Sequence, residues 1–189
     1  MRADELTALE PGRLLLPPTE LRIATGTAAV LVGGTPISRL VLAHALTGRL
    51  PTERVRLRGR LEVFGATSAA DIRDRSLLAL PWRARTRPTA VARRLAALEW
   101  ATDRAVGARR PHLLLVVLSP GLEGLQPDEV AQVVAATTSL NDLGPTVLLT
   151  GPDPAPASGG TKASGGPSLA QHPAKPTFGG TITVAALPS

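Results

Sequence analysis

The chain has 189 residues, of which 43% are hydrophobic, and carries a formal net charge of +6 without any cysteine. This length allows one ordinary domain with a sizeable core and leaves little room for a second. The lack of cysteine excludes disulfides, zinc–thiolate sites and cysteine nucleophiles, and it fits a cytosolic protein. Aromatic residues make up only 2%, so the core must be built from Leu, Val, Ala and Ile.

The sequence contains no pattern typical of a membrane span or a signal peptide. Its longest apolar runs, Ala28–Val32 and Leu113–Leu118, are far too short to cross a bilayer. We therefore expect any work at a membrane to go through a partner. The positive charge is almost all arginine, scattered rather than interleaved with aromatic residues, which disfavours nucleic-acid binding.

Residues 1–20 are mixed in character: Pro11-Gly12 and Pro17-Pro18 punctuate a short apolar run, Leu14–Leu16, and no element is assigned to them. A short strand is expected at Leu21–Ile23, and a short buried strand at Ala28–Val32.

A loop of small residues, Gly33–Ser38, comes next. The apolar spacing of Arg39–Thr47 then predicts a helix, with Ser38 as its N-cap and Gly48 as its C-terminal stop. The unit is therefore strand, glycine-containing loop, helix.

Arginine alternates with apolar residues over Arg54–Phe64, which predicts an amphipathic strand or hairpin whose arginines form a solvated face. Helices are predicted at Ala69–Leu80 and Thr89–Val106. Within the second, Trp100 is interpreted as a packing residue or a partner contact.

Leu113–Leu118 predicts a central strand buried on both faces. Pro127 and the acids after it open a helix that runs to about Leu140, and Thr146–Thr150 is another buried strand. Strands that alternate with helices imply a parallel sheet with helices on both faces.

The composition changes at residue 151, after which Pro, Gly, Ala and Ser dominate. We therefore divide the chain into a domain of residues 1–153, a flexible linker of residues 154–180, and a C-terminal segment of residues 181–189. That last segment could add an edge strand or dock elsewhere as a short apolar peptide.

Three segments resemble the ATP-binding cassettes of ABC transporters, in the order that this family has. Leu31–Gly48 resembles the Walker A strand, loop and helix, typically LVGPNGSGKSTLL followed by ALAG. Arg110–Pro120 with Gly124–Pro127 resembles the Walker B strand and D-loop, and Thr146–Asp153 resembles the strand and switch loop. The resemblance covers roughly residues 20–153 and implies an α/β fold of the P-loop NTPase type, with a mainly parallel sheet and flanking helices.

Most of the residues that perform catalysis in this family are replaced by other residues in this sequence. A loop glycine corresponds to Pro36, the phosphate-binding Lys to Arg39 and the Mg²⁺-binding hydroxyl to Leu40. The Walker B carboxylates align with Leu118 and Ser119, so no carboxylate remains there to hold Mg²⁺ or activate water. The comparison therefore predicts no catalytic residue and no metal site.

Three further departures concern the family's signature motif, its switch His and its helical subdomain. Around Arg93–Ala97 the Gly-Gly of the signature motif is missing, and the switch His aligns with Pro152. Residues 65–92 are few for the family's helical subdomain, so a reduced one is expected.

The remaining loop residues form the predicted nucleotide site: Gly33, Gly34, Thr35, Ser38 and Arg39. A helix N-terminus attracts anions and arginine can pair with phosphate, so binding of ATP without Mg²⁺ is one hypothesis. The alternative is that the loop is held by packing and its arginine lies at the surface.

The other polar residues predict no catalytic constellation. Glu123 is interpreted as a solvated loop residue and Asp128 as an acid at a helix start. His44 is expected in mid-helix, and no pair of the three histidines has metal-ligand spacing.

Three functions stay open at this stage. The first is an ABC-cassette-like protein that does not hydrolyse ATP and acts as an interaction or regulatory subunit. Its partner would be a second cassette, in a homodimer or heterodimer, or a membrane protein, and it would be cytoplasmic or peripheral at the inner face of the membrane. The second is a divergent ATP-binding protein with weak ATPase activity. The third is a basic binder of nucleic acid or lipid surfaces that uses Arg54–Arg60 and Arg83–Arg94.

Overall fold

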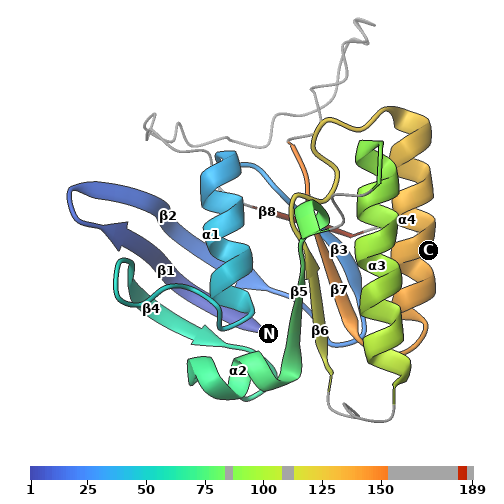
Figure 1. Cartoon of the computed structure of the whole chain (residues 1–189). Helices are drawn as coiled ribbons and strands as arrows, with labels where there is room; N and C mark the ends of the chain where they lie inside the picture. The colour runs from blue at the N-terminus through green and yellow to red at the C-terminus, as the bar shows by residue number, and fades with distance from the viewer. Residues whose placement is uncertain (84–86, 108–112, 153–182, 187–189) are drawn as a thin grey trace, which may run out of the picture.

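The structure is a computed structural model that describes residues 1–83, 87–107, 113–152 and 183–186. Its elements form a five-stranded and a three-stranded sheet (Figure 1). In chain order the elements are β1 (Arg2–Glu10), β2 (Arg13–Arg22), β3 (Ala28–Val32), α1 (Pro36–Leu46), β4 (Arg56–Glu62), α2 (Ala69–Arg75), β5 (Ser76–Ala79), the 3-10 turn η1 (Pro81–Arg83), α3 (Ala90–Val106), β6 (Leu115–Leu118), α4 (Pro127–Asn141), β7 (Thr146–Thr150) and β8 (Thr183–Ala186).

The five-stranded sheet has the order β5-β6-β7-β3-β8, in which the first four strands are parallel and β8 is antiparallel. Helix α1 covers one face, and α3 and α4 cover the other (Figure 1). This confirms the predicted α/β fold with a mainly parallel sheet. Between β5 and β6 the described residues hold only η1 and α3.

Strand β6 shows why an unbroken apolar run sits at the centre of the sheet. Leu115 and Val117 belong to the core cluster on the α1 side, while Val116 and Leu118 belong to the cluster under α3 and α4. All four side chains are fully buried. Since successive side chains of a strand point to opposite faces, a strand covered on both faces must be apolar throughout.

Residues 1–20, to which no element is assigned from the sequence, form two strands. Strands β1 and β2 form an antiparallel hairpin, and β4 pairs with the other side of β1. Pro17 and Pro18 lie within β2, an edge strand, where a residue without an N–H group removes no necessary ladder bond. Every second or third side chain of β1 is nonetheless buried, including Ala3, Leu6 and Ala8.

The helix predicted at Ala69–Leu80 was wrong in its second half. Helix α2 ends at Arg75, and Ser76 starts β5, which pairs in parallel with β6. The residues of β5 are all buried, including Leu77 and Leu78. A short apolar run cannot be assigned to helix or strand by periodicity, and here tertiary pairing decides.

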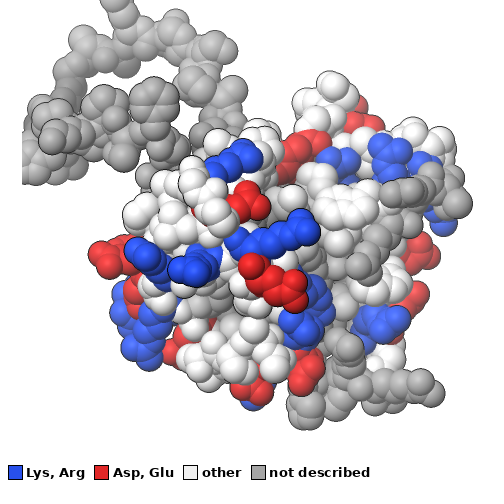
Figure 2. Space-filling view, turned by 60° about the vertical axis from the view of Figure 1, so that its left-hand side comes forward, with Lys and Arg blue, Asp and Glu red and all other residues white. Residues whose placement is uncertain are grey.

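The arginine-rich stretch forms β4, as predicted, and Arg56, Arg58 and Arg60 are exposed. The apolar face of β4 is only partly covered by the rest of the protein, since Leu57 is exposed as well. Figure 2 shows basic and acidic side chains interspersed on the side that carries this sheet. Arg60, for example, lies 3.6 Å from a carboxylate oxygen of Glu62.

The end of the chain returns to the main sheet. Strand β8 lies at its edge and pairs with β3. The linker assigned to residues 154–180 lies outside the described residues. In the part of the chain that the structure describes, no helix is long and apolar enough to cross a membrane.

One testable consequence of the packing concerns Gly48, at the C-terminal end of α1. Its φ is +62°, and a Cβ there would lie 2.2 Å from the Ala69 carbonyl oxygen. Gly65 also has a positive φ, +79°, but a Cβ there would meet nothing within 4 Å. We expect Gly48→Ala to lower the free energy of unfolding by about 3 kcal/mol, and Gly65→Ala by only about 1 kcal/mol. Urea denaturation checks this, and equal losses would contradict the packing described.

Candidate functional site: a glycine loop closed by a buried arginine

The candidate site lies where β3 passes into α1. Gly33 and Gly34 follow the strand with φ angles of +85° and +61°, a left-handed conformation that suits glycine. The helix then begins at Pro36, which occupies its first turn. It therefore begins earlier than predicted, and the residue that aligns with the phosphate-binding Lys lies inside the helix.

The prediction of Ser38 as N-cap was wrong, because Thr35 holds that position. The Thr35 hydroxyl accepts from the backbone N–H of Ser38 at 3.1 Å. In return, the backbone N–H of Thr35 donates to the Ser38 hydroxyl at 2.8 Å. This reciprocal capping box satisfies two N–H groups at the end of the helix from within the chain.

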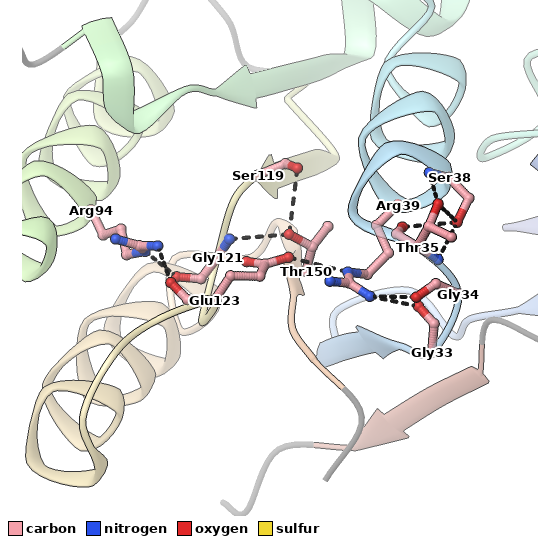
Figure 3. A network of polar contacts seen from close by, with 10 residues as sticks. All are labelled: Gly33, Gly34, Thr35, Ser38, Arg39, Arg94, Ser119, Gly121, Glu123 and Thr150. Carbon is pink, nitrogen blue, oxygen red and sulfur yellow. Dashed lines mark hydrogen bonds and ion pairs between the residues drawn. The ribbon is translucent and has the colours of Figure 1, made fainter. Parts of the chain in front are cut away.

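Arg39 turns back over the loop (Figure 3). Its Nη1 donates to the carbonyl oxygens of Gly33 and Gly34, at 2.8 and 2.9 Å. The residue is only 4% exposed, so the alternative of a surface arginine was also wrong. A buried guanidinium requires hydrogen-bond partners, and here the loop itself provides them.

The third partner of this guanidinium is Glu123, in the loop that follows β6. Arg39 Nε lies 3.2 Å from Glu123 Oε1, across 84 positions of sequence. The interpretation of Glu123 as a solvated loop residue was therefore wrong: its side chain is 22% exposed, and its Oε2 is buried without a hydrogen-bond partner. Asp128 does lie in the first turn of α4, as expected.

A second buried arginine holds the same loop from the opposite side. Arg94 of α3 donates from Nε to the carbonyl of Gly121 and from Nη2 to the carbonyl of Glu123. Burial lowers the pKa of Arg94 below its usual value, and the Glu123 carboxylate partly offsets this. Arg94 lies within the segment that aligns with the family's signature motif.

The end of β7 completes the network. The backbone N–H of Gly121 donates to the Thr150 hydroxyl at 3.0 Å, and that of Leu122 donates to the Thr150 carbonyl at 2.7 Å. A Cβ at Gly121 would lie 2.4 Å from the same carbonyl oxygen. The loop after β6 therefore packs against the main chain of β7 too closely for any side chain at this position.

The structure brings all five predicted loop residues together, in two groups. Gly33, Gly34 and Arg39 form the loop closure, whereas Thr35 and Ser38 form the helix cap. Sequence reasoning missed Glu123, Arg94 and Thr150 as members of the same network (Figure 3). The only available signal was that Glu123 follows a buried parallel strand, whose C-terminal end lies at the same edge of the sheet as the glycine loop.

The geometry does not fit the phosphates that a loop of this type holds in its family. A phosphate site needs several backbone N–H groups directed at one point. Here two carbonyl oxygens point at a guanidinium, Pro36 has no N–H, and the N–H of Ser38 is bonded to Thr35. Within the described residues, no three His, Asp or Glu side chains gather where they could hold a metal ion.

The buried ion pair can be tested by a double-mutant cycle. We expect Arg39→Ala to lower the free energy of unfolding by about 2–4 kcal/mol, because it leaves the two loop carbonyls and Glu123 without their donor. Glu123→Ala should lower the free energy of unfolding by less than Arg39→Ala does, since it removes only one of the three partners of the Arg39 guanidinium. The double variant should be more stable than the sum of the losses predicts, by about 1 kcal/mol.

Chemical denaturation provides these values, and Arg58→Ala, at an exposed position of β4, is the matched control. We expect that control to stay within about 0.5 kcal/mol of the natural chain. A loss of the same small size for Arg39→Ala would show that its buried contacts contribute nothing.

Comparison with known proteins agrees with the fold. No protein-family model matches the sequence, and no curated protein matches it. Among solved structures, the chain is similar to CbiO1 from Clostridium perfringens, a part of the ABC transporter complex CbiONQ. The two superpose with a TM-score of 0.52 at 14% sequence identity, over 80% of this chain and 78% of that one. This chain therefore has the fold of an ABC-transporter ATP-binding cassette.

Proposed function

We propose that this protein is an ABC-cassette-like subunit that does not hydrolyse ATP and acts through protein contacts. The observation that carries the proposal is the closed glycine loop. Arg39, at the position of the phosphate-binding Lys, donates to the carbonyls of Gly33 and Gly34 and pairs with Glu123. A phosphate group would have to displace these bonds and would then meet carbonyl oxygens rather than N–H groups.

The residues at the end of β6 support the same conclusion. In an active cassette a carboxylate there helps to hold Mg²⁺ and another activates the attacking water. In this chain Leu118 is buried in the core, and the Ser119 hydroxyl accepts from the Thr150 hydroxyl at 3.4 Å. Neither side chain can take a proton from water or bind a divalent ion as a carboxylate does.

The chain has the fold of an ATP-binding cassette although it lacks these catalytic carboxylates. This combination favours a role in an assembly. The related CbiO1 is part of a transporter complex. We propose that the present chain likewise joins a transporter-like or membrane-associated complex, as an interaction or regulatory subunit beside another cassette or a membrane protein. It would then lie in the cytoplasm or at the inner face of the membrane through that partner.

Calorimetric titration with ATP, with and without Mg²⁺, tests the loss of nucleotide binding. We expect no saturable heat up to millimolar ATP in either condition, for the natural chain and for Arg39→Ala alike. An active ABC cassette titrated under the same conditions is the positive control. Binding that Mg²⁺ strengthens and that Arg39→Ala abolishes would instead support a divergent ATP-binding protein.

A further inference from the structure

A second site lies away from the glycine loop, beside the outermost strand of the main sheet. A hollow of about 400 Å³ opens there between the C-terminal part of α1, strand β5 and the second half of α3. Leu77, Leu78 and Leu80 contribute its apolar lining. The volume is in the range of ordinary ligand sites and suits one or two side chains of a partner.

The polar lining of this hollow is basic. It consists of His44 from α1, Arg49 just after that helix, and Arg104 from α3. The Arg49 guanidinium is fixed by the main chain, donating to the Thr47 carbonyl at 2.7 Å and to the Ser76 carbonyl at 3.1 Å. Among the residues that the structure describes, no carboxylate lines the hollow, although acidic residues are common elsewhere on the molecule.

Trp100 gives the hollow its one aromatic wall. It packs against the core cluster under α3 and α4 while staying partly accessible. The Arg104 guanidinium carbon lies 5.3 Å from the centre of the Trp100 ring. This stacking holds an exposed cation in one place at the rim, next to an apolar surface.

We propose that this hollow, called here the basic hollow, docks an acidic segment of the partner protein. A carboxylate of that segment would pair with Arg104, and a neighbouring apolar side chain would lie against Trp100 and Leu80. Guanidinium groups match carboxylates in geometry and charge, and aromatic and arginine side chains are the usual centres of protein interfaces. The proposal rests on the proposed function, because it names the kind of partner that the subunit binds.

The test uses the full chain with Trp82→Phe, which leaves Trp100 as its one tryptophan. The probe is the blocked peptide acetyl-Leu-Glu-Leu-Glu-Leu-amide, and its Gln-for-Glu counterpart is the uncharged control. Trp100 emission and the anisotropy of fluorescein-labelled peptide are both recorded. We expect saturable binding of the acidic peptide and at least tenfold weaker binding of the uncharged one.

Two variants separate the basic hollow from general electrostatic attraction. Arg104→Ala removes an exposed side chain and should weaken binding of the acidic peptide at least tenfold, and Arg104→Lys should weaken it less. Arg58→Ala removes the same charge from β4 and should leave binding unchanged. Equal weakening by both alanine variants would overturn the proposal.

Each of the remaining outcomes would contradict or support a particular part of the proposal. Absence of binding up to millimolar peptide, or equal binding of the uncharged peptide, would overturn the proposal. Competition by acetate or phosphate at the concentration of the peptide would show a small-anion site rather than a docking surface. If neither the peptide nor ATP binds, the docking role proposed for the basic hollow is wrong, whereas the proposed function stands. If ATP binds with Mg²⁺, the proposed function fails whatever the peptide does.

Discussion

The buried guanidinium of Arg39 is the constraint on which the candidate site depends. A charge placed in the interior must be surrounded by acceptors, or its desolvation would cost several kcal/mol. The acceptors available at this position are the carbonyls of Gly33 and Gly34 and the carboxylate of Glu123. Because Arg39 uses all three, it joins the loop after β3 to the loop after β6.

The main source of the stability of the fold lies elsewhere, in packing on both faces of the main sheet. Strands β3, β6 and β7 bury continuous apolar side chains between α1 on one face and α3 with α4 on the other. The loop after β6 adds to this packing, because Leu122 and Leu125 lie against the core cluster under α3 and α4. In the proposed assembly role, helix surfaces and the edge at β5 would supply the contacts with a partner.

Sequence reasoning predicted the elements that show a strong local pattern. The central strands stand out as unbroken apolar runs, and Thr89–Val106 has helical spacing that α3 reproduces. It failed where long-range pairing decides: β5 becomes a strand because β6 lies beside it, and β2 accepts Pro17 and Pro18 because it is an edge. The pair of Arg39 and Glu123 joins positions 84 apart, which no spacing rule connects, so the loop could be predicted but its closure could not.

Hydrogen exchange of the backbone amides, with and without millimolar MgATP, tests most directly whether the glycine loop is closed from within. If Arg39 holds the loop, the amides of Thr35, Ser38 and Gly121 exchange slowly in the natural chain and MgATP leaves their rates unchanged. The same amides should exchange faster in Arg39→Ala. Rapid exchange in the natural chain, slowed by MgATP, would contradict the account, because it would show an open loop that closes on a nucleotide.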